Sequence, residues 1–182
     1  MPLPQQFVPA HPIAGTEHSG VEAGFATLFQ GKRLILTPLP DTSPDAIETV
    51  KNLWSMTGSN IETMDPVRHD QVFAATSHLP HILAFTLVET LYRMEENEHL
   101  LKYASGGFSD FTRIASSDPV MWRDICLHNS ESLLAAVDGL QDGLNTLIEA
   151  IKHQDGEKIQ HLFQIAKDTR DHKILNSTQE PE

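Results

Sequence analysis

The sequence predicts a mainly α protein in which a short α/β segment, residues 1–65, precedes a helical region, residues 66–182. Short apolar runs bounded by prolines and glycines, which are typical of strands, occur before Asp65. After Asp65 the apolar residues recur every three or four positions, which is the period of an amphipathic helix. The length of 182 residues suits one ordinary domain or slightly more.

The α/β segment contains three predicted strands and one predicted helix. The runs QFVPA (6–10), RLILTPLP (33–40) and NIETMD (60–65) are the strands. A helix is predicted over 43–58, because proline stands at its first helical position and glycine at its end. Three strands and one helix cannot cover both faces of a parallel sheet, so this segment resembles the end of a larger sheet.

The helical region is predicted to begin at Pro66, and its first helix runs to about residue 93. Pro80 lies inside this helix and has no N–H to donate. We therefore expect a kink with freed backbone groups near Thr76 and Ser77. Further helices are expected over 95–104, from Pro119 as one long helix, and from Gly156 to about Leu175, with a break over 105–119.

Apolar residues along the long helix follow a heptad-like spacing. They step by four and three positions in turn: Leu133, Val137, Leu140, Leu144, Leu147 and Ile151. Such a seam needs a partner helix. The partner is either another helix of the same chain or the same helix of a second copy, and the spacing alone favours neither.

Composition excludes several classes of protein. The formal net charge of −12 argues against a nucleic-acid partner, which requires basic patches. No run of about 18 apolar residues is present, so no membrane span is expected. The start MPLPQQFVPA lacks the features of a signal peptide. A single cysteine, Cys126, permits no internal disulfide, and we expect a cytoplasmic protein.

Four groups of residues could carry chemistry. In chain order they are His11 with Thr16 and Glu17, His78 with His81, Asp110 with Arg113, and Trp122. Histidine is the natural side chain for taking a proton near neutral pH. The arginine fork makes two charge-assisted hydrogen bonds to a carboxylate.

Each group also has a plainer interpretation. A loop histidine is often solvated, Arg113 could pair with Asp110 along a helix, and Trp122 could belong to the core. His78 and His81 are three residues apart, a spacing at which both could bind one metal ion. No nearby cysteine and no carboxylate is evident as a third ligand, so no metal is expected. The remaining histidines are expected at the surface: His18, His69, His99, His128, His153, His161 and His172.

Three motifs taken together resemble one known family. HPIAGTEHSGVEAG (11–24), ATSHLPHILAF (75–85) and GGFSDFTRIASSDPVMWRDI (106–125), in this order and at these distances, closely resemble bacterial prephenate dehydrogenases. That family, with arogenate and cyclohexadienyl dehydrogenases, makes the tyrosine precursor by NAD(P)-dependent oxidative decarboxylation. The resemblance runs from about Phe7 to the last helix.

The resemblance implies a role for each candidate residue. His11 matches the catalytic histidine that draws the proton from the ring hydroxyl of prephenate, and Arg113 matches the arginine that holds a substrate carboxylate. His81 matches a histidine that faces both substrate and nicotinamide. The resemblance further implies Thr16 and Gly106 in substrate binding, Glu17 in gating, His78 near the cofactor, Asp110 in a polar network beside the arginine, and Trp122 at the pocket mouth.

The resemblance also implies an architecture. Family members join an N-terminal dinucleotide-binding domain to a helical C-terminal domain that forms an intertwined homodimer. Residues 1–65 would then be the last part of a Rossmann-like cofactor domain, and 66–182 the dimerisation and substrate-binding domain. The G-x-G-x-x-G fingerprint for NAD or NADP does not occur in the sequence. A shortened chain, inactive by itself, is therefore expected.

Two functions remain open at this point. In the first, the chain belongs to a prephenate dehydrogenase of tyrosine biosynthesis, which converts prephenate to 4-hydroxyphenylpyruvate and needs the missing part for activity. In the second, the chain is a non-catalytic dimerisation module, or a regulatory module that binds tyrosine through Arg113. The choices between prephenate and arogenate, and between NAD and NADP, are not made by these residues.

Overall fold

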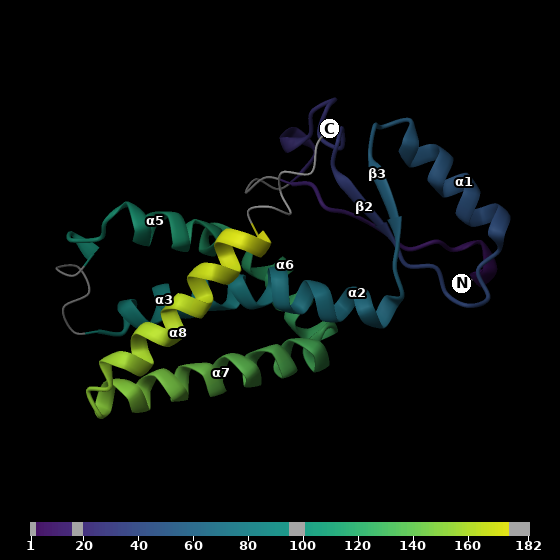
Figure 1. Cartoon of the computed structure of the whole chain (residues 1–182). Helices are drawn as coiled ribbons and strands as arrows, with labels where there is room; N and C mark the ends of the chain where they lie inside the picture. The colour runs from purple at the N-terminus through teal and green to yellow at the C-terminus, as the bar shows by residue number, and fades with distance from the viewer. Residues whose placement is uncertain (1–2, 16–19, 95–100, 175–182) are drawn as a thin grey trace. The chain divides into compact units, whose positions relative to one another are not determined.

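The computed structural model describes residues 3–15, 20–94 and 101–174 (Figure 1). A small three-stranded sheet comes first and is followed by a series of helices, which confirms the predicted mainly α class. The chain divides into two compact units, residues 1–134 and 135–182. The first unit contains the sheet and every helix up to the start of α7, and the second contains the rest of α7 and α8.

The sheet has the order β1 (Ala10–Pro12), β2 (Arg33–Leu36) and β3 (Asn60–Thr63). β1 pairs antiparallel with β2 and places His11 opposite Ile35. β3 pairs parallel with β2, so the sheet is mixed. β2 ends four residues short of its predicted end, where the sequence turns to prolines that cannot donate to a ladder.

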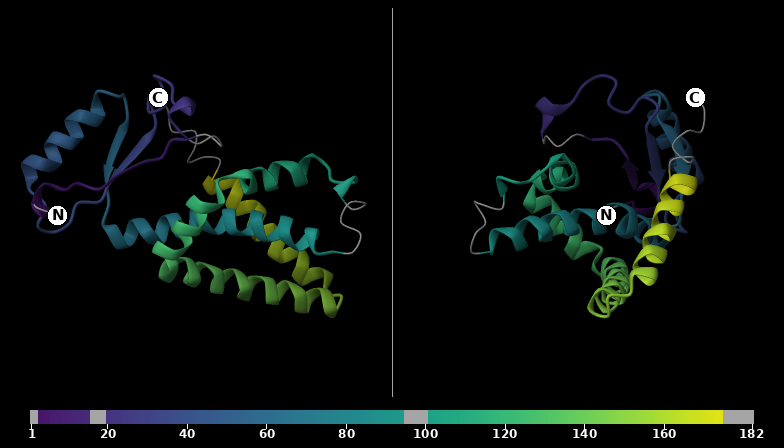
Figure 2. Two further views of the ribbon diagram at one scale, coloured as in Figure 1. Left: turned by 180° about the vertical axis from the view of Figure 1, so that it is seen from behind. Right: turned by 60° about the vertical axis from the view of Figure 1, so that its left-hand side comes forward.

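The core of this part is the central strand. Leu34, Ile35 and Leu36 are 0%, 1% and 0% exposed. Helix α1 (Pro44–Ser55) packs beside β3, as both views in Figure 2 show. The turn that leads from α1 into β3 requires a positive φ of 77° at Gly58, a conformation that favours glycine.

The first predicted helix forms a nearly continuous rod in Figures 1 and 2. It consists of α2 (Pro66–Phe73), a π-helical turn (Ala74–His78) and α3 (Leu79–Tyr92). The sequence predicted a kink at Pro80 with freed backbone groups near Thr76 and Ser77. The structure instead has a π-helical turn that contains Thr76 and Ser77 and ends at His78, two residues before Pro80. One carbonyl in this turn, that of Ser77, accepts a hydrogen bond of 2.9 Å from Nδ1 of His81. The side chain of His81 thus donates to the backbone carbonyl four positions before it, within this irregular turn.

The predicted break over 105–119 is wrong for most of its length. Helix α5 (Gly106–Thr112) and a 3-10 turn (Arg113–Ser116) occupy it. Ser105 precedes α5 with an extended backbone, and the two glycines that suggested a break fall in the first helical turn. The helix predicted over 95–104 falls largely on residues 95–100, which lie outside the described residues.

The single long helix predicted from Pro119 is also wrong. It is divided into α6 (Pro119–His128) and α7 (Ser130–Lys152) at Asn129, whose φ of −112° and ψ of 36° are not helical. The Asn129 amide donates to the Asp70 carbonyl oxygen over 2.8 Å and to Nδ1 of His78 over 3.2 Å. Asparagine side chains that bond elsewhere compete with helix continuation, which explains the break.

In the second unit, the last helix begins at Gly156, as the sequence predicted. α7 ends at Lys152, Gln154 in the connection has a positive φ of 53°, and α8 (Gly156–Thr169) begins after Asp155. The Asp155 carboxylate caps α8 by accepting from the Lys158 backbone N–H over 3.0 Å. α8 continues into a π-helical turn over Arg170–Ile174.

The predicted seam is buried at one end and exposed at the other. Leu133 is 5% exposed, whereas Leu144 and Ile151 are 50% and 57% exposed. The intramolecular core therefore accounts for the beginning of the seam. The exposed apolar positions in α7 are surface that the described residues of this chain do not cover.

The segment Pro66–Tyr92 is long and apolar enough to cross a bilayer, judged by length and composition alone. One such helix is weak evidence, because core helices of water-soluble proteins pass the same test. The segment also contains Asp70 and the histidines of the site described below. Ionisable residues of this kind are rare in membrane spans.

We expect Leu34→Ala to lower the free energy of unfolding by about 2–5 kcal/mol, because it leaves a cavity in the most buried strand. Urea unfolding followed by circular dichroism measures this change. Leu39→Ala is the matched control, since Leu39 is 49% exposed and its truncation leaves no cavity. Equal losses in the two variants would contradict the assignment of β2 as the core.

Candidate functional site

A pocket of about 440 Å³ in the first unit is lined by four of the residues predicted from the sequence. These residues are His11, His81, Arg113 and Trp122. They come from β1, α3, the 3-10 turn and α6, so the pocket forms only when distant segments fold together. Such convergence of a few polar groups on one concavity is the usual form of a ligand site.

Local hydrogen bonds hold the two backbone segments that carry His11 and Trp122 into the pocket. β1 is held at its end by the Ile13 N–H, which donates to the Arg33 carbonyl oxygen over 2.8 Å. Asp118 caps α6 by accepting from the backbone N–H groups of Val120 and Met121, which fixes the turn that carries Trp122. Trp122 is 8% exposed.

His11 is in contact with a second histidine that the sequence did not assign to the site. Its Nδ1 lies 2.9 Å from Nε2 of His69, and the two ring centroids are 5.1 Å apart. Nδ1 of His69 lies 2.9 Å from Oδ1 of Asp70. The ring of Phe73 packs on both histidines, at centroid distances of 4.8 Å from His11 and 4.6 Å from His69.

The prediction that His69 lies at the surface is therefore wrong, since only 18% of its side chain is exposed. The physical reason is that α2 turns His69 toward β1. A sequence signal was available, because His69, Phe73, Ser77 and His81 recur every four positions on one helical segment.

His81 and Trp122 form the flat wall of the pocket. Their rings are stacked with centroids 3.6 Å apart and an angle of 19° between the planes. The Ser77 carbonyl accepts from Nδ1 of His81, so Nε2 is the unprotonated nitrogen when this ring is neutral. A planar ring is the ligand shape that packs best against such a surface.

The other predicted residues that the structure describes, His78, Gly106 and Asp110, are not among those that line the pocket. His78 accepts at Nδ1 from the Asn129 amide. Its ring centroid lies 6.0 Å from that of Trp122, so it is next to Trp122 but does not line the pocket. Gly106 and Asp110 belong to α5 and do not line the pocket. Thr16 and Glu17 lie outside the described residues. Lining residues that the sequence did not single out are Pro12, Ile13, Ala14, Gly15, Ser77, Ile114 and Ser117.

Three histidines of this region have lowered pKa values. Burial lowers the pKa of His11, and the neighbouring His69 and His78 lower it further. Burial also lowers the pKa of His78 and of His81, and the Arg113 charge contributes at His81. At neutral pH these imidazoles are therefore uncharged and able to accept a proton.

Two family models match the chain. One is described as the prephenate dehydrogenase nucleotide-binding domain and matches residues 1–63. The other is described as the prephenate dehydrogenase dimerization domain and matches residues 65–165.

Individual relatives agree with these models. A cyclohexadienyl dehydrogenase of Zymomonas mobilis is 40% identical over 165 residues, covering 90% of this chain and 56% of the relative. A prephenate dehydrogenase of Bacillus subtilis is 41% identical over 172 residues, covering 94% of this chain and 46% of the relative. The chain thus spans about half the length of these relatives.

A solved structure is also similar. It is a prephenate dehydrogenase of A. aeolicus in complex with hydroxyphenyl propionate and NAD+. Its TM-score is 0.84 at 47% sequence identity, and the match covers 90% of this chain and 58% of that one.

We expect the stability of the chain to fall as the pH drops below the ordinary histidine value of 6.5. Because the folded pKa of His11 is lowered, the unfolded chain binds more protons in the window between that pKa and 6.5. The stabilising contribution is fully present above 6.5 and is lost as the pH falls through this window. Urea unfolding at several pH values measures the slope.

The variant His11→Phe keeps a ring but removes the titrating group. Its free energy of unfolding should depend less on pH than that of the unaltered chain, although His78 and His81 still contribute. Identical slopes in the two proteins would show that His11 titrates as an ordinary exposed histidine.

Proposed function

The chain belongs to the prephenate dehydrogenase family, and from this premise we propose that its pocket is the substrate half of a dehydrogenase site. The substrate is prephenate or the related acid arogenate. The observation that carries the proposal is the convergence of His11, Arg113 and the stacked His81–Trp122 pair on one pocket. These supply a base, a carboxylate anchor and a wall for a planar ring.

His11 is the proposed catalytic base. Its lowered pKa keeps the imidazole neutral at physiological pH, which is the form that can take a proton from a ring hydroxyl. When the hydroxyl proton moves to the imidazole, the electrons of the O–H bond form the C=O bond as hydride leaves the same carbon. The bond between the ring and the carboxylate then breaks and releases carbon dioxide. Its electrons restore aromaticity, and the ring oxygen takes a proton back from the His11 imidazolium to become a phenol.

Arg113 is the proposed anchor for a substrate carboxylate. A guanidinium binds a carboxylate through two parallel charge-assisted hydrogen bonds, which sets the orientation of the ring as well as its affinity. The wall formed by His81 and Trp122 supports one face of that ring. Both prephenate and arogenate carry a ring hydroxyl that His11 can deprotonate and a carboxylate that Arg113 can bind.

NAD is the proposed cofactor, with NADP as the alternative. The support is the match of residues 1–63 to a nucleotide-binding domain and the NAD+ bound to the A. aeolicus relative. When bound, NAD supplies the hydride acceptor. The flat wall formed by His81 and Trp122 suits a planar ring such as nicotinamide. We therefore propose that His81 and His78 lie on the side of the pocket that faces the nicotinamide.

The remaining residues keep the roles that the family resemblance implies. We propose that Thr16 and Gly106 take part in substrate binding, that Glu17 gates the pocket, and that Asp110 belongs to a polar network with Arg113. Trp122 is proposed at the pocket mouth. Of these, Gly106 and Asp110 belong to α5 and lie outside the pocket lining.

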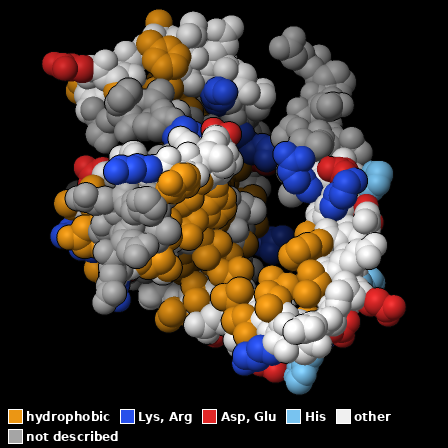
Figure 3. All heavy atoms as spheres, turned by 90° about the vertical axis from the view of Figure 1, so that its left-hand side faces the viewer, with side chains coloured by type: hydrophobic (Ala, Val, Ile, Leu, Met, Phe, Trp, Pro, Cys, Tyr) orange, Lys and Arg blue, Asp and Glu red, His pale blue; other side chains and the backbone are white. Residues whose placement is uncertain are grey.

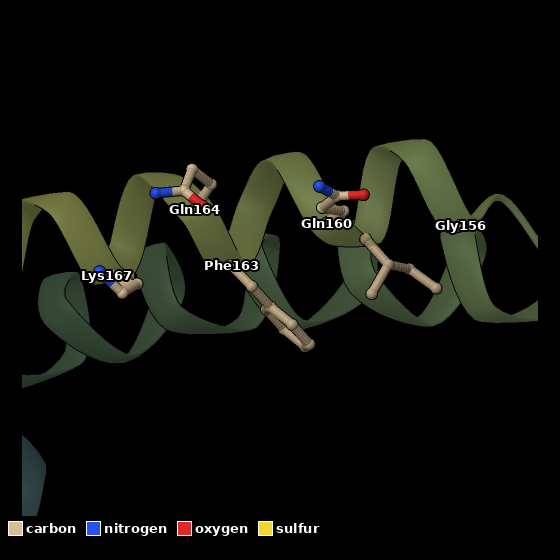
Figure 4. Close-up of a pocket in the computed structure, with 6 residues that line it drawn as sticks. Gly156, Gln160, Phe163, Gln164 and Lys167 are labelled. Carbon is tan, nitrogen blue, oxygen red and sulfur yellow. The ribbon is translucent and has the colours of Figure 1, made fainter.

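We further propose a domain boundary at residues 65 and 66, with 66–182 forming a homodimer. The family model over 65–165 is described as a dimerization domain. Hydrophobic side chains gather on the surface in Figure 3, and exposed apolar residues occur in both α7 and α8. Along α8 a groove of about 400 Å³ is lined by Ile159 and Phe163 among others, and Figure 4 shows Phe163 pointing away from Gln160 and Gln164.

We expect this chain to bind hydroxyphenyl propionate, and Arg113→Ala to weaken the binding about 10- to 100-fold. The reason is that a hydrogen bond to a charged group contributes about 1.5–3 kcal/mol. Isothermal titration calorimetry measures the affinity.

Arg123→Ala is the matched control, because Arg123 lies outside the pocket lining and pairs with Asp124 on the surface. Its affinity should equal that of the unaltered chain. Equal weakening in both variants would contradict the anchoring role of Arg113. A parallel titration with tyrosine tests the regulatory alternative, which predicts tighter binding of tyrosine than of hydroxyphenyl propionate.

We expect light scattering to give twice the chain mass of 20.3 kDa. Phe163→Glu should shift the mass toward one chain, because a buried charge in an apolar interface is costly. Lys158→Glu introduces the same residue at an exposed position of α8 and should leave the dimer intact. A monomeric mass for the unaltered chain would refute the homodimer.

A further inference from the structure

We propose that His69 is a positioning residue that fixes the tautomer of His11 and leaves Nε2 of His11 as the nitrogen that accepts a proton. The inference rests on the proposed function of the pocket for its meaning. Its physical basis is the row of hydrogen-bonding groups that runs from Asp70 through His69 to His11.

The direction of each hydrogen bond in the row follows from the Asp70 carboxylate at its end. The Asp70 carboxylate can only accept, so Nδ1 of His69 must carry the proton that it donates to Oδ1 over 2.9 Å. A neutral His69 then has an unprotonated Nε2. This Nε2 can only accept, and the atom 2.9 Å away is Nδ1 of His11, which must therefore donate.

The result is that His11 has its proton on Nδ1 and an open electron pair on Nε2. Free histidine prefers the opposite tautomer, with the proton on Nε2. In that tautomer the nitrogen left for a ligand could donate to a ring hydroxyl but could not take its proton. The contact with His69 thus selects the form of His11 that the proposed reaction requires.

The surroundings hold this arrangement in place. Phe73 packs on the rings of both His69 and His11, which restricts their rotation. The charged and titratable groups that face His11 are His69, His78, Asp70 behind His69, and Arg113 across the pocket. Burial and the neighbouring His69 and His78 lower the pKa of His11, which keeps a proton off its Nε2 and leaves that electron pair open.

Asn129 supports the same row from the other side. It donates to the backbone carbonyl of Asp70 and to Nδ1 of His78. The Asn129 amide therefore links α2, which carries Asp70 and His69, to the break between α6 and α7. The carboxylate of Asp70 is left to His69.

The test is a long-range proton–nitrogen correlation spectrum of this chain with nitrogen-labelled histidine, recorded above pH 7 without ligand. The nitrogen shifts distinguish a protonated from an unprotonated ring nitrogen. We expect His11 to show a protonated Nδ1 and an unprotonated Nε2. A protonated Nε2 in the unaltered chain would overturn the proposal.

Two variants of His69 separate hydrogen bonding from packing. His69→Phe keeps the ring and removes the acceptor, so His11 should revert to the Nε2–H tautomer. His69→Gln retains an oxygen that can accept from Nδ1 of His11, so the Nδ1–H tautomer should be retained. Equal spectra in the two variants, changed or unchanged, would contradict the proposal.

Phe73→Leu is the matched control, because it disturbs the same ring cluster without touching a hydrogen bond, and the His11 tautomer should not change. If His69→Phe does not fold, Asp70→Ala provides a second route. Without the carboxylate, His69 can adopt either tautomer, and the protonated fraction of His11 Nδ1 should fall. An unchanged fraction would count against the row.

The spectra and the ligand titration fail independently. A chain with the expected tautomer that binds no hydroxyphenyl propionate would refute the proposed function and leave the role of His69 intact. A chain that binds the ligand through Arg113 but has His11 in the Nε2–H form would refute the role of His69 alone.

Discussion

The site depends on one irregular turn, the π-helical turn Ala74–His78. On a regular α-helix, side chains four residues apart point in directions that differ by about 40° around the helix axis. His69 and His81 are twelve residues apart, so their side chains would point about 120° apart. A π-helical turn takes one extra residue, which recovers about 100° of that difference. His69 and His81 can therefore both face the region of His11 from one continuous rod.

The same turn is stabilised by the groups that it presents. Pro80 has no backbone N–H, and the Ser77 carbonyl in the turn accepts a hydrogen bond from the ring of His81. Asn129 then donates to Asp70, which precedes the turn, and to His78, the last residue of the turn. The backbone irregularity and the orientation of the site histidines are thus held by shared hydrogen bonds, so neither can change without the other.

The electrostatics of the pocket follow from this packing. Gathering His11, His69 and His78 in a partly buried cluster disfavours the charged imidazolium, so the pKa of His11 falls. A positive Arg113 on the same pocket acts in the same direction on His81. The pocket therefore combines neutral bases with a fixed cation, which suits an acid that carries both a hydroxyl and a carboxylate.

The sequence by itself determined the order of β2, α1 and β3, the helix starts at Pro66 and Gly156, the departure from regular helix before Pro80, and four residues of the pocket lining, because these depend on local propensity or on recognisable motifs. The tertiary structure decided the place of His69 and the break at Asn129. The reason is range. His69 meets His11 across 58 positions of sequence and Asn129 meets Asp70 across 59, and hydrophobic periodicity carries no information about such pairs.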